Sequence, residues 1–219
     1  MERLEAALDW AKSYDVDQIA RSVQAIGFEC TRCGRCCQGT EAEPHTATVF
    51  PDEVRGIQDS TGRSWSGVAR PMPYGISDGG GETFEWALQG GNCGDCTFLE
   101  SDGDRTRCSI YGDRPLLCQT YPFKLSLPVT GGPDASAVAS HGKVVASECP
   151  GLGGEMSRKR ALAIAETLKE RAIRELQETR SLRENYRPRP DLSGVVVHDS
   201  EGRKLPDGRP VEAAERDNY

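Results

Sequence analysis

The sequence predicts a mixed α+β fold, in which N-terminal helices and a long C-terminal amphipathic helix flank a small, irregular core with short strands that is organised by cysteines. Nine cysteines are present, and the stretch CTRCGRCC, residues 30–37, holds four of them. The 24 glycines and 13 prolines predict many turns and irregular connections. Apolar residues recur at helical spacing near both ends of the chain.

Two short helices are expected before the cysteine run, because apolar residues recur every three or four positions from Leu4 to Ile26. Asp15 is the expected N-cap of the second helix and Gly27 its expected end. Residues 1–29 are therefore predicted to be helices packed on the core. The same spacing predicts a long amphipathic helix within 155–186, with an apolar stripe of Ala161, Ala165, Leu168, Ala172 and Leu176. This helix is expected to cover the core, and docking of a partner is the alternative.

Between these helices the local patterns predict short elements. Strands are expected in HTATVF (45–50), in TFEWALQ (83–89, with Phe84, Trp86 and Leu88 on one half-buried face) and in KVVAS (143–147). A hairpin turning at Asp102–Gly103, a helical turn at PDEVRGIQ (51–58) and a short helix before Pro122 are also expected. We predict a long loop at 60–82, and either a small hairpin or a flexible tail at 187–219.

Charge and hydropathy limit the partners and the compartment. The formal net charge of -7 argues against a protein that coats nucleic acid. No apolar run approaches the ~20 residues of a membrane span, so no membrane partner is expected. The start MERLEAALDW lacks the features of a signal peptide, which predicts a cytoplasmic protein with reduced thiols. A cysteine cluster in that setting indicates metal binding before disulfides.

The cysteine run has the spacing C-x2-C-x2-C-C. Gly34 suits a tight turn that directs backbone amides at thiolates. Three closely spaced cysteines with a remote fourth are typical of a cubane iron–sulfur site. Because adjacent side chains point apart, Cys36 and Cys37 are expected to face two centres or one large cluster. A nucleophilic cysteine needs a histidine base, and none of His45, His141 and His198 lies in a recognisable catalytic context. His45 or His141 as a metal ligand is an alternative without support.

The order of motifs resembles the YkgJ-type cysteine-cluster family, which is named for its CxxCxxCC motif and described as zinc- or iron-chelating. CTRCGRCC is followed by CTFLESDGDRTRCSIYGDRPLLCQTYPF and then by CPGLGGE, so the resemblance covers about 30–154, the expected metal-binding domain. Thr97 and Gln119 depart from the family's usual proline and arginine, and Cys93 lies outside its pattern. The resemblance implies eight metal ligands: Cys30, Cys33, Cys36, Cys37, Cys96, Cys108, Cys118 and Cys149.

Residues near these cysteines have expected supporting roles. Arg114 is expected to offset the negative charge of a thiolate-ligated group, and Pro115 to stiffen the turn before Cys118. Tyr121, with Tyr111 and Phe123, is a candidate to shield the group from water, although ordinary core packing is the simpler explanation for the aromatic residues.

Several functions are consistent with this pattern. We favour a cysteine-ligated iron–sulfur cluster, [4Fe-4S], with a redox or catalytic role. An unknown protein partner or an electron-transfer partner is compatible with this role. A structural zinc protein and an interaction module are the alternatives. A cluster-dependent lysine methyltransferase is a further alternative, because relatives of the cysteine pattern include flagellin lysine N-methylase. No S-adenosylmethionine motif is visible, so the sequence leaves open whether the protein is an enzyme.

Overall fold

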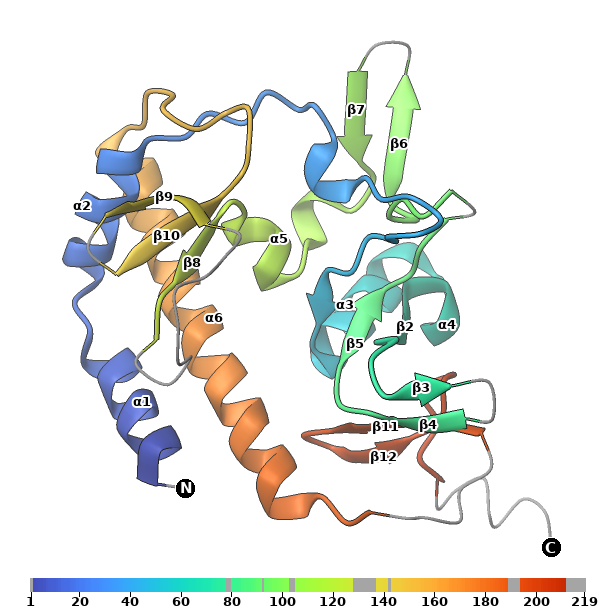
Figure 1. Cartoon of the computed structure of the whole chain (residues 1–219). Coiled ribbons are helices and arrows are strands. Elements are labelled where there is room, and N and C mark those ends of the chain that lie inside the picture. The colour runs from blue at the N-terminus through green and yellow to red at the C-terminus, as the bar shows by residue number, and fades with distance from the viewer. Residues whose placement is uncertain are drawn as a thin grey trace, which may run out of the picture. The chain divides into compact units, whose positions relative to one another are not determined.

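The computed structural model describes residues 2–77, 80–91, 93–102, 105–127, 137–141, 143–188 and 194–211. Its helices and small sheets confirm the α+β class (Figure 1). The chain forms two compact units, each assembled from segments that are distant in sequence. The first unit contains Met1–Cys36, Ser101–Thr106 and Leu116–Arg180, and the second contains Cys37–Glu100, Arg107–Pro115 and Ser181–Tyr219. In the described part of the chain no helix is long and apolar enough to cross a membrane.

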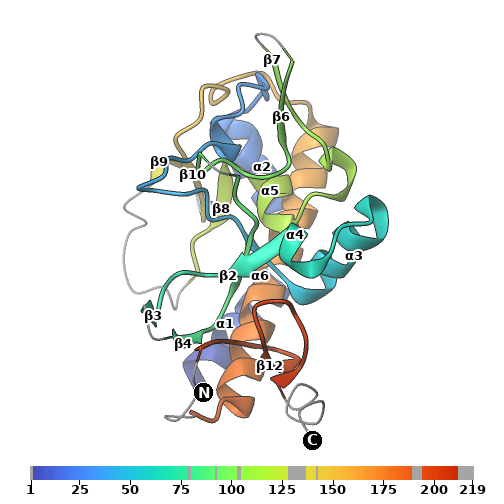
Figure 2. The same ribbon diagram turned by 90° about the vertical axis from the view of Figure 1, so that its right-hand side faces the viewer.

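The first unit packs helices against one small antiparallel sheet. Its helices are α1 (Glu2–Ser13), α2 (Val16–Ile26), α5 (Leu116–Thr120) and most of α6 (Arg158–Asn185). The sheet has the strand order β8-β10-β9, from β8 (Phe123–Leu125), β9 (Ala137–His141) and β10 (Val144–Ser147). Figures 1 and 2 show this sheet beside α2 and α6. The core between them includes Val23, Phe28, Phe123, Val144 and Leu168, all buried.

Local signals set the helix ends in this unit. The Asp15 carboxylate accepts a hydrogen bond of 2.9 Å from the Gln18 amide, and Gly27 ends α2 with φ 73°. Both predictions are confirmed. The stripe predicted on α6 is also confirmed, because its five apolar residues are the buried residues of that helix. Phe123 lies 1 % exposed and packs edge-on against Phe28, so core packing is its role.

The second unit contains α3 (Pro51–Thr61), α4 (Trp65–Val68) and two further sheets. One sheet has the order β1-β5-β2, from β1 (Thr48–Val49), β2 (Ala69–Pro71) and β5 (Trp86–Leu88). The other has the order β12-β11-β4-β3, from β3 (Ile76–Ser77), β4 (Gly80–Thr83), β11 (Gly194–Asp199) and β12 (Gly202–Lys204). In that sheet β4 pairs in parallel with β11, so the segment Gly194–Asp199 belongs to the fold of this unit.

The hairpin of β6 (Leu99–Asp102) and β7 (Arg105–Cys108) has the predicted location. Its turn was expected at Asp102–Gly103, and Gly103 lies outside the described residues. The base of the hairpin belongs to the second unit and its tip to the first.

Two predictions for the second unit are wrong. The long loop expected at 60–82 instead contains α4, β2, β3 and the start of β4. Ser64 caps α4 by accepting a hydrogen bond from the Gly67 amide, and the buried Trp65 and Val68 anchor it. Phe84 lies outside β5 and is 44 % exposed, while all three residues of β5 are buried. The expected alternation fails because both faces of β5 are buried, so neither set of side chains faces solvent.

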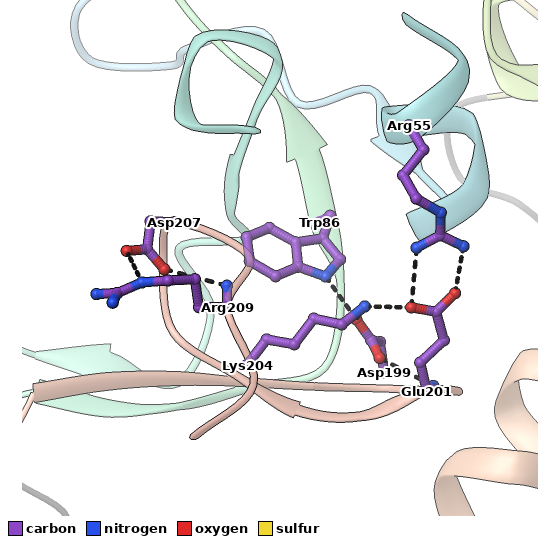
Figure 3. A network of polar contacts seen from close by, with 7 residues as sticks. All are labelled: Arg55, Trp86, Asp199, Glu201, Lys204, Asp207 and Arg209. Atoms are coloured by element: carbon purple, nitrogen blue, oxygen red, sulfur yellow. Dashed lines mark hydrogen bonds and ion pairs between the residues drawn. The ribbon is translucent and has the colours of Figure 1, made fainter. Parts of the chain in front are cut away.

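A network of charged side chains joins elements of the second unit (Figure 3). Glu201 accepts two hydrogen bonds from the Arg55 guanidinium, at 2.5 and 3.0 Å. The Lys204 ammonium lies 2.6 Å from Glu201 and 2.9 Å from Asp199, and Asp199 also accepts the Trp86 indole N–H at 2.9 Å. Lys204 and Asp199 are each 6 % exposed, so the network ties the hairpin of β11 and β12 to α3 and β5.

Candidate metal centre

All nine cysteine positions, each among the described residues, carry thiols and not disulfides. These cysteines are distributed over both units, and the boundary between the units in the N-terminal run falls between Cys36 and Cys37. The first unit holds Cys30, Cys33, Cys36, Cys118 and Cys149, and the second holds Cys37, Cys93, Cys96 and Cys108.

Backbone pairing in the first unit brings Cys149 to the N-terminal cysteine run. The Glu29 amide donates to the Gly151 carbonyl at 2.9 Å, and the Gly153 amide donates to the Gly27 carbonyl at 3.1 Å. Phe28 and Leu152 form the antiparallel bridge between these bonds. In an antiparallel pair, the residues that follow one partner lie opposite the residues that precede the other. Cys30 follows Phe28 and Cys149 precedes Leu152, so the two cysteines lie at the same end of the bridge.

This close pairing depends on glycine. A Cβ added at Gly151 would lie 2.1 Å from the Glu29 carbonyl oxygen, and one added at Gly27 would lie 2.6 Å from the Gly154 carbonyl oxygen. Gly27 also has φ 73°, which disfavours any residue with a side chain. The motif CPGLGG therefore allows two backbone segments to meet beside the cysteines.

The loop between the first cysteines is fixed by the tip of the β6–β7 hairpin. The Thr106 hydroxyl donates a hydrogen bond of 2.8 Å to the Arg32 carbonyl. Gly34 has the positive φ predicted for a tight turn, 74°, and a Cβ there would lie 2.6 Å from Thr106 Oγ1. The hairpin thus holds the turn between Cys33 and Cys36.

Tyr121 fixes the other side of the candidate centre. Its hydroxyl donates to the Glu148 carbonyl at 2.6 Å, directly before Cys149. Burial, followed by the negative charge of Cys149, Cys36 and Cys33, raises the pKa of Tyr121 to about 12. At neutral pH the ring therefore stays a neutral hydrogen-bond donor beside these thiols.

Electrostatics also indicate that four thiols gather in the first unit. Burial raises the pKa of the Cys149 thiol, and a hydrogen bond from the Gly151 amide works in the opposite direction. The negative charges of Cys33, Cys36 and Cys30 raise that pKa further. Cys149 also packs against the apolar core, whereas the other three thiols are exposed.

The second unit brings Cys37 and Cys96 together. The Cys96 amide donates to the Cys37 carbonyl at 2.8 Å, and the Gly39 amide donates to the Asp95 carboxylate at 2.9 Å. Cys108 ends β7, and the next residue, Ser109, donates its amide to the Phe98 carbonyl at 2.9 Å. The Leu99 amide donates to the Cys96 carbonyl at 3.0 Å and closes a turn over residues 96–99. This turn makes backbone hydrogen bonds to Cys37 on one side and to Ser109, the residue after Cys108, on the other.

The remaining candidates occupy varied positions. Arg114 stacks over the ring of Tyr111 at 3.9 Å and donates to the Tyr111 carbonyl, and Tyr111 is 56 % exposed rather than packed in the core. Cys118 is half-buried in α5, and Cys93 is exposed. His45 donates its amide to the Gly94 carbonyl. His141 lies in β9, and its side chain is outside the described residues.

His198 is a buried residue that the sequence placed in a doubtful tail. It is 3 % exposed and lies 2.9 Å from the Glu82 carboxylate, which also accepts a hydrogen bond from the Tyr186 hydroxyl. The signal that could have found it is the apolar run GVVVH, which is typical of a buried strand.

The donor atoms suit the metals that bind thiolates. Sulfur-only sets hold zinc and iron–sulfur clusters, and the sets here contain only cysteines. Among the described residues, however, no three or more His, Cys, Asp or Glu side chains are arranged to hold a metal ion directly. The thiols are gathered by the backbone, and coordination requires their side chains to turn toward a common point.

Comparison with protein families supports metal binding by this region. Residues 29–150 match the family model CxxCxxCC, described as "Putative zinc- or iron-chelating domain". Comparisons with curated proteins and with solved structures gave no match. The matched region includes every cysteine predicted as a ligand and covers more than half of the chain. The chain therefore belongs to the CxxCxxCC family of zinc- or iron-chelating domains.

Proposed function

We propose that the protein carries a cysteine-ligated iron–sulfur cluster, [4Fe-4S], and acts in electron transfer with a protein partner. The observation that carries the proposal is the gathering of Cys30, Cys33 and Cys36 with the remote Cys149 in one unit. Three closely spaced thiolates and a distant fourth match the ligand pattern of cubane clusters. The bound cluster would supply reversible one-electron transfer, with the electron received from a reduced donor protein and passed to an oxidised acceptor protein.

The surroundings of Cys149 support a bound group that carries positive metal charge. Burial is the main cause that raises the pKa of Cys149, and the negative charges of Cys33, Cys36 and Cys30 raise it further, because thiolates close together repel one another. Metal ions remove this repulsion, because a coordinating thiol is deprotonated and its charge is neutralised. Tyr121 would hold the backbone at Glu148 and partly cover the group. Cys30, Cys33, Cys36 and Cys149 are the proposed ligands of the cluster, and the other four cysteines of the family pattern are candidate metal ligands.

A structural zinc centre is the alternative, since the same thiolates suit tetrahedral Zn²⁺. Hydrophobic residues make up only 37 % of the chain, so a metal that joins distant segments would stabilise the fold. Zinc predicts a colourless protein that tolerates air, whereas a cluster predicts a brown protein that bleaches.

The test is anaerobic purification of the full chain, followed by an absorption spectrum and analysis for iron, zinc and acid-labile sulfide. A cluster gives broad absorbance near ~400 nm with equal amounts of iron and sulfide. The variant Cys149→Ser should lose iron, and the matched control Cys93→Ser should keep it because Cys93 is exposed and outside the family pattern. Stoichiometric zinc without iron or sulfide would overturn the redox proposal.

A further inference from the structure

We propose that the chain holds two separate metal centres, whose ligands are divided at the peptide bond between Cys36 and Cys37. The first centre takes Cys30, Cys33, Cys36 and Cys149, and the second takes Cys37, Cys96 and Cys108. This inference rests on the proposed metal-binding function, and it assigns the thiols that act together.

The geometry of residues 35–37 separates the two adjacent thiols. Arg35–Cys37 form a 3-10 helix, in which three residues complete one turn. Consecutive side chains therefore point about 120° apart, so Cys36 and Cys37 face different directions. One zinc ion, with Zn–S bonds of about 2.3 Å, would bind both only if the two side chains turned back toward one side.

The segments before and after this turn make backbone contacts beside different groups of thiols. On the side of Cys36, the strand pairing of 27–29 with 151–153 places Cys149 beside the run. The Tyr121 hydroxyl holds the same segment from Glu148. These contacts all lie within the first unit.

On the side of Cys37, the chain is held by the turn around Cys96. The Cys96 amide bonds to the Cys37 carbonyl, and two residues later the Gly39 amide bonds to Asp95. A Cβ added at Gly94 would lie 2.1 Å from the Thr40 carbonyl oxygen, so these segments meet closely. Cys96 is 5 % exposed, which makes it the most buried thiol of the chain.

These contacts lie within the second unit, and the boundary between the units falls between Cys36 and Cys37. Two ligand groups that fold with two different units are expected to bind and release metal independently. The division does not depend on Cys118, which lies in α5.

Cadmium is the probe that tests the division, because ¹¹³Cd²⁺ binds thiolates and its NMR shift reports the ligands of each ion. The full chain is loaded anaerobically with ¹¹³Cd²⁺ after removal of its native metal. Two resolved signals are expected for the unmodified sequence. Cys149→Ser should remove one signal and Cys96→Ser the other, while Cys93→Ser should keep both.

A single signal, or the loss of every signal in both Cys149→Ser and Cys96→Ser, would overturn the two-centre inference. A chain that binds no cadmium, zinc or iron would instead overturn the proposed metal binding itself.

A second measurement uses the unmodified sequence and so does not depend on whether a variant folds. The cadmium-loaded chain is treated with a chelator, and thiols are alkylated at intervals and identified by mass spectrometry. Cys30, Cys33, Cys36 and Cys149 should lose protection together, and Cys37, Cys96 and Cys108 should lose it together at a different rate. One common rate for all seven thiols would overturn the inference.

Discussion

The hydroxyl of Tyr121 donates a hydrogen bond of 2.6 Å to the backbone carbonyl of Glu148. This contact joins the chain after α5 to the residue that precedes Cys149, so a side chain outside the cysteine set controls the position of one proposed ligand. Groups that orient metal ligands commonly affect affinity by 10- to 100-fold.

Tyr121→Phe should therefore weaken metal binding without unfolding the protein. We expect the apparent metal affinity of the variant to be about 10-fold lower, so that a competing chelator removes its metal more easily. The free energy of unfolding should fall by only about 1 kcal/mol. The measurement is a chelator competition at neutral pH together with urea unfolding. Tyr74→Phe is the matched control, because Tyr74 is 74 % exposed. Equal affinities for Tyr121→Phe and the unmodified chain would show that the contact does not position Cys149.

Gly151→Ala should separate the two segments that carry Cys30 and Cys149. The added Cβ would lie 2.1 Å from the Glu29 carbonyl oxygen, so the backbone must move. We expect a loss of stability of about 1–3 kcal/mol and a loss of metal from the first centre. Metal analysis and thermal unfolding measure the two effects.

Gly56→Ala is the control for that substitution. Gly56 lies inside α3 with no atom within 4 Å of an added Cβ, so alanine should stabilise the helix by up to about 1 kcal/mol. If Gly151→Ala behaved like Gly56→Ala, the close approach at Glu29 would not be required for metal binding.

The acid stability of the second unit should depend on Glu201. The hydrogen bond from Arg55 is the main cause that lowers the pKa of Glu201 to about 2 from the usual 4.5, with burial opposing and Lys204 assisting. Because the folded-state pKa is depressed, its contribution is complete above pH 4.5 and is lost as the pH falls toward 2. The carboxylate is 38 % exposed, so solvent screening reduces the effect to about 1 kcal/mol.

Glu201→Gln should remove this part of the pH dependence. The measurement is urea unfolding of both proteins at several pH values between 2 and 6, and the quantity compared is the difference in the free energy of unfolding. That difference should shrink as the pH falls from 4.5 toward 2. A difference that stays constant across the range would contradict the prediction.

Removal of one partner from the buried pair of Lys204 and Asp199 should lower the free energy of unfolding more than removal of one partner from an exposed pair. Lys204→Met leaves the carboxylates of Asp199 and Glu201 without their ammonium partner, and Asp199 is 6 % exposed. Removal of one partner from a buried pair costs about 3–5 kcal/mol. Urea unfolding should show this loss for Lys204→Met. The exposed Arg209, paired with Asp207, is the control, and Arg209→Met should cost less than about 1 kcal/mol.

The parts of the fold that the sequence predicts are those with local causes. Asp15 and Gly27 cap α2 through contacts within a few residues, and the stripe on α6 follows from helical spacing alone. By contrast, β4 pairs not only with its neighbour β3 but also with β11, more than 100 residues later. No local pattern around 80–83 contains that information, so the region is predicted as a loop.

The candidate site shows the same division. The spacing of the first four cysteines indicates a metal site, and the family resemblance implies the other ligands. The adjacency of Cys36 and Cys37 predicts that they face apart. The contact between Tyr121 and Glu148 could not be predicted, because it depends on how α5 and the segment before Cys149 pack. The burial of His198 against Glu82 was also missed, since both residues lie in strands that are paired only in the folded sheet.

The parallel pairing of β4 with β11 has a consequence for the newborn chain. The ribosome makes Cys149 before it makes Gly194–Asp199, so every proposed ligand of the first centre emerges before the second unit has its β11 strand. The other proposed ligands, Cys37, Cys96 and Cys108, are made before Cys149, so all seven precede β11. The sheet β12-β11-β4-β3 of the second unit can therefore be completed only after every proposed ligand has been synthesised.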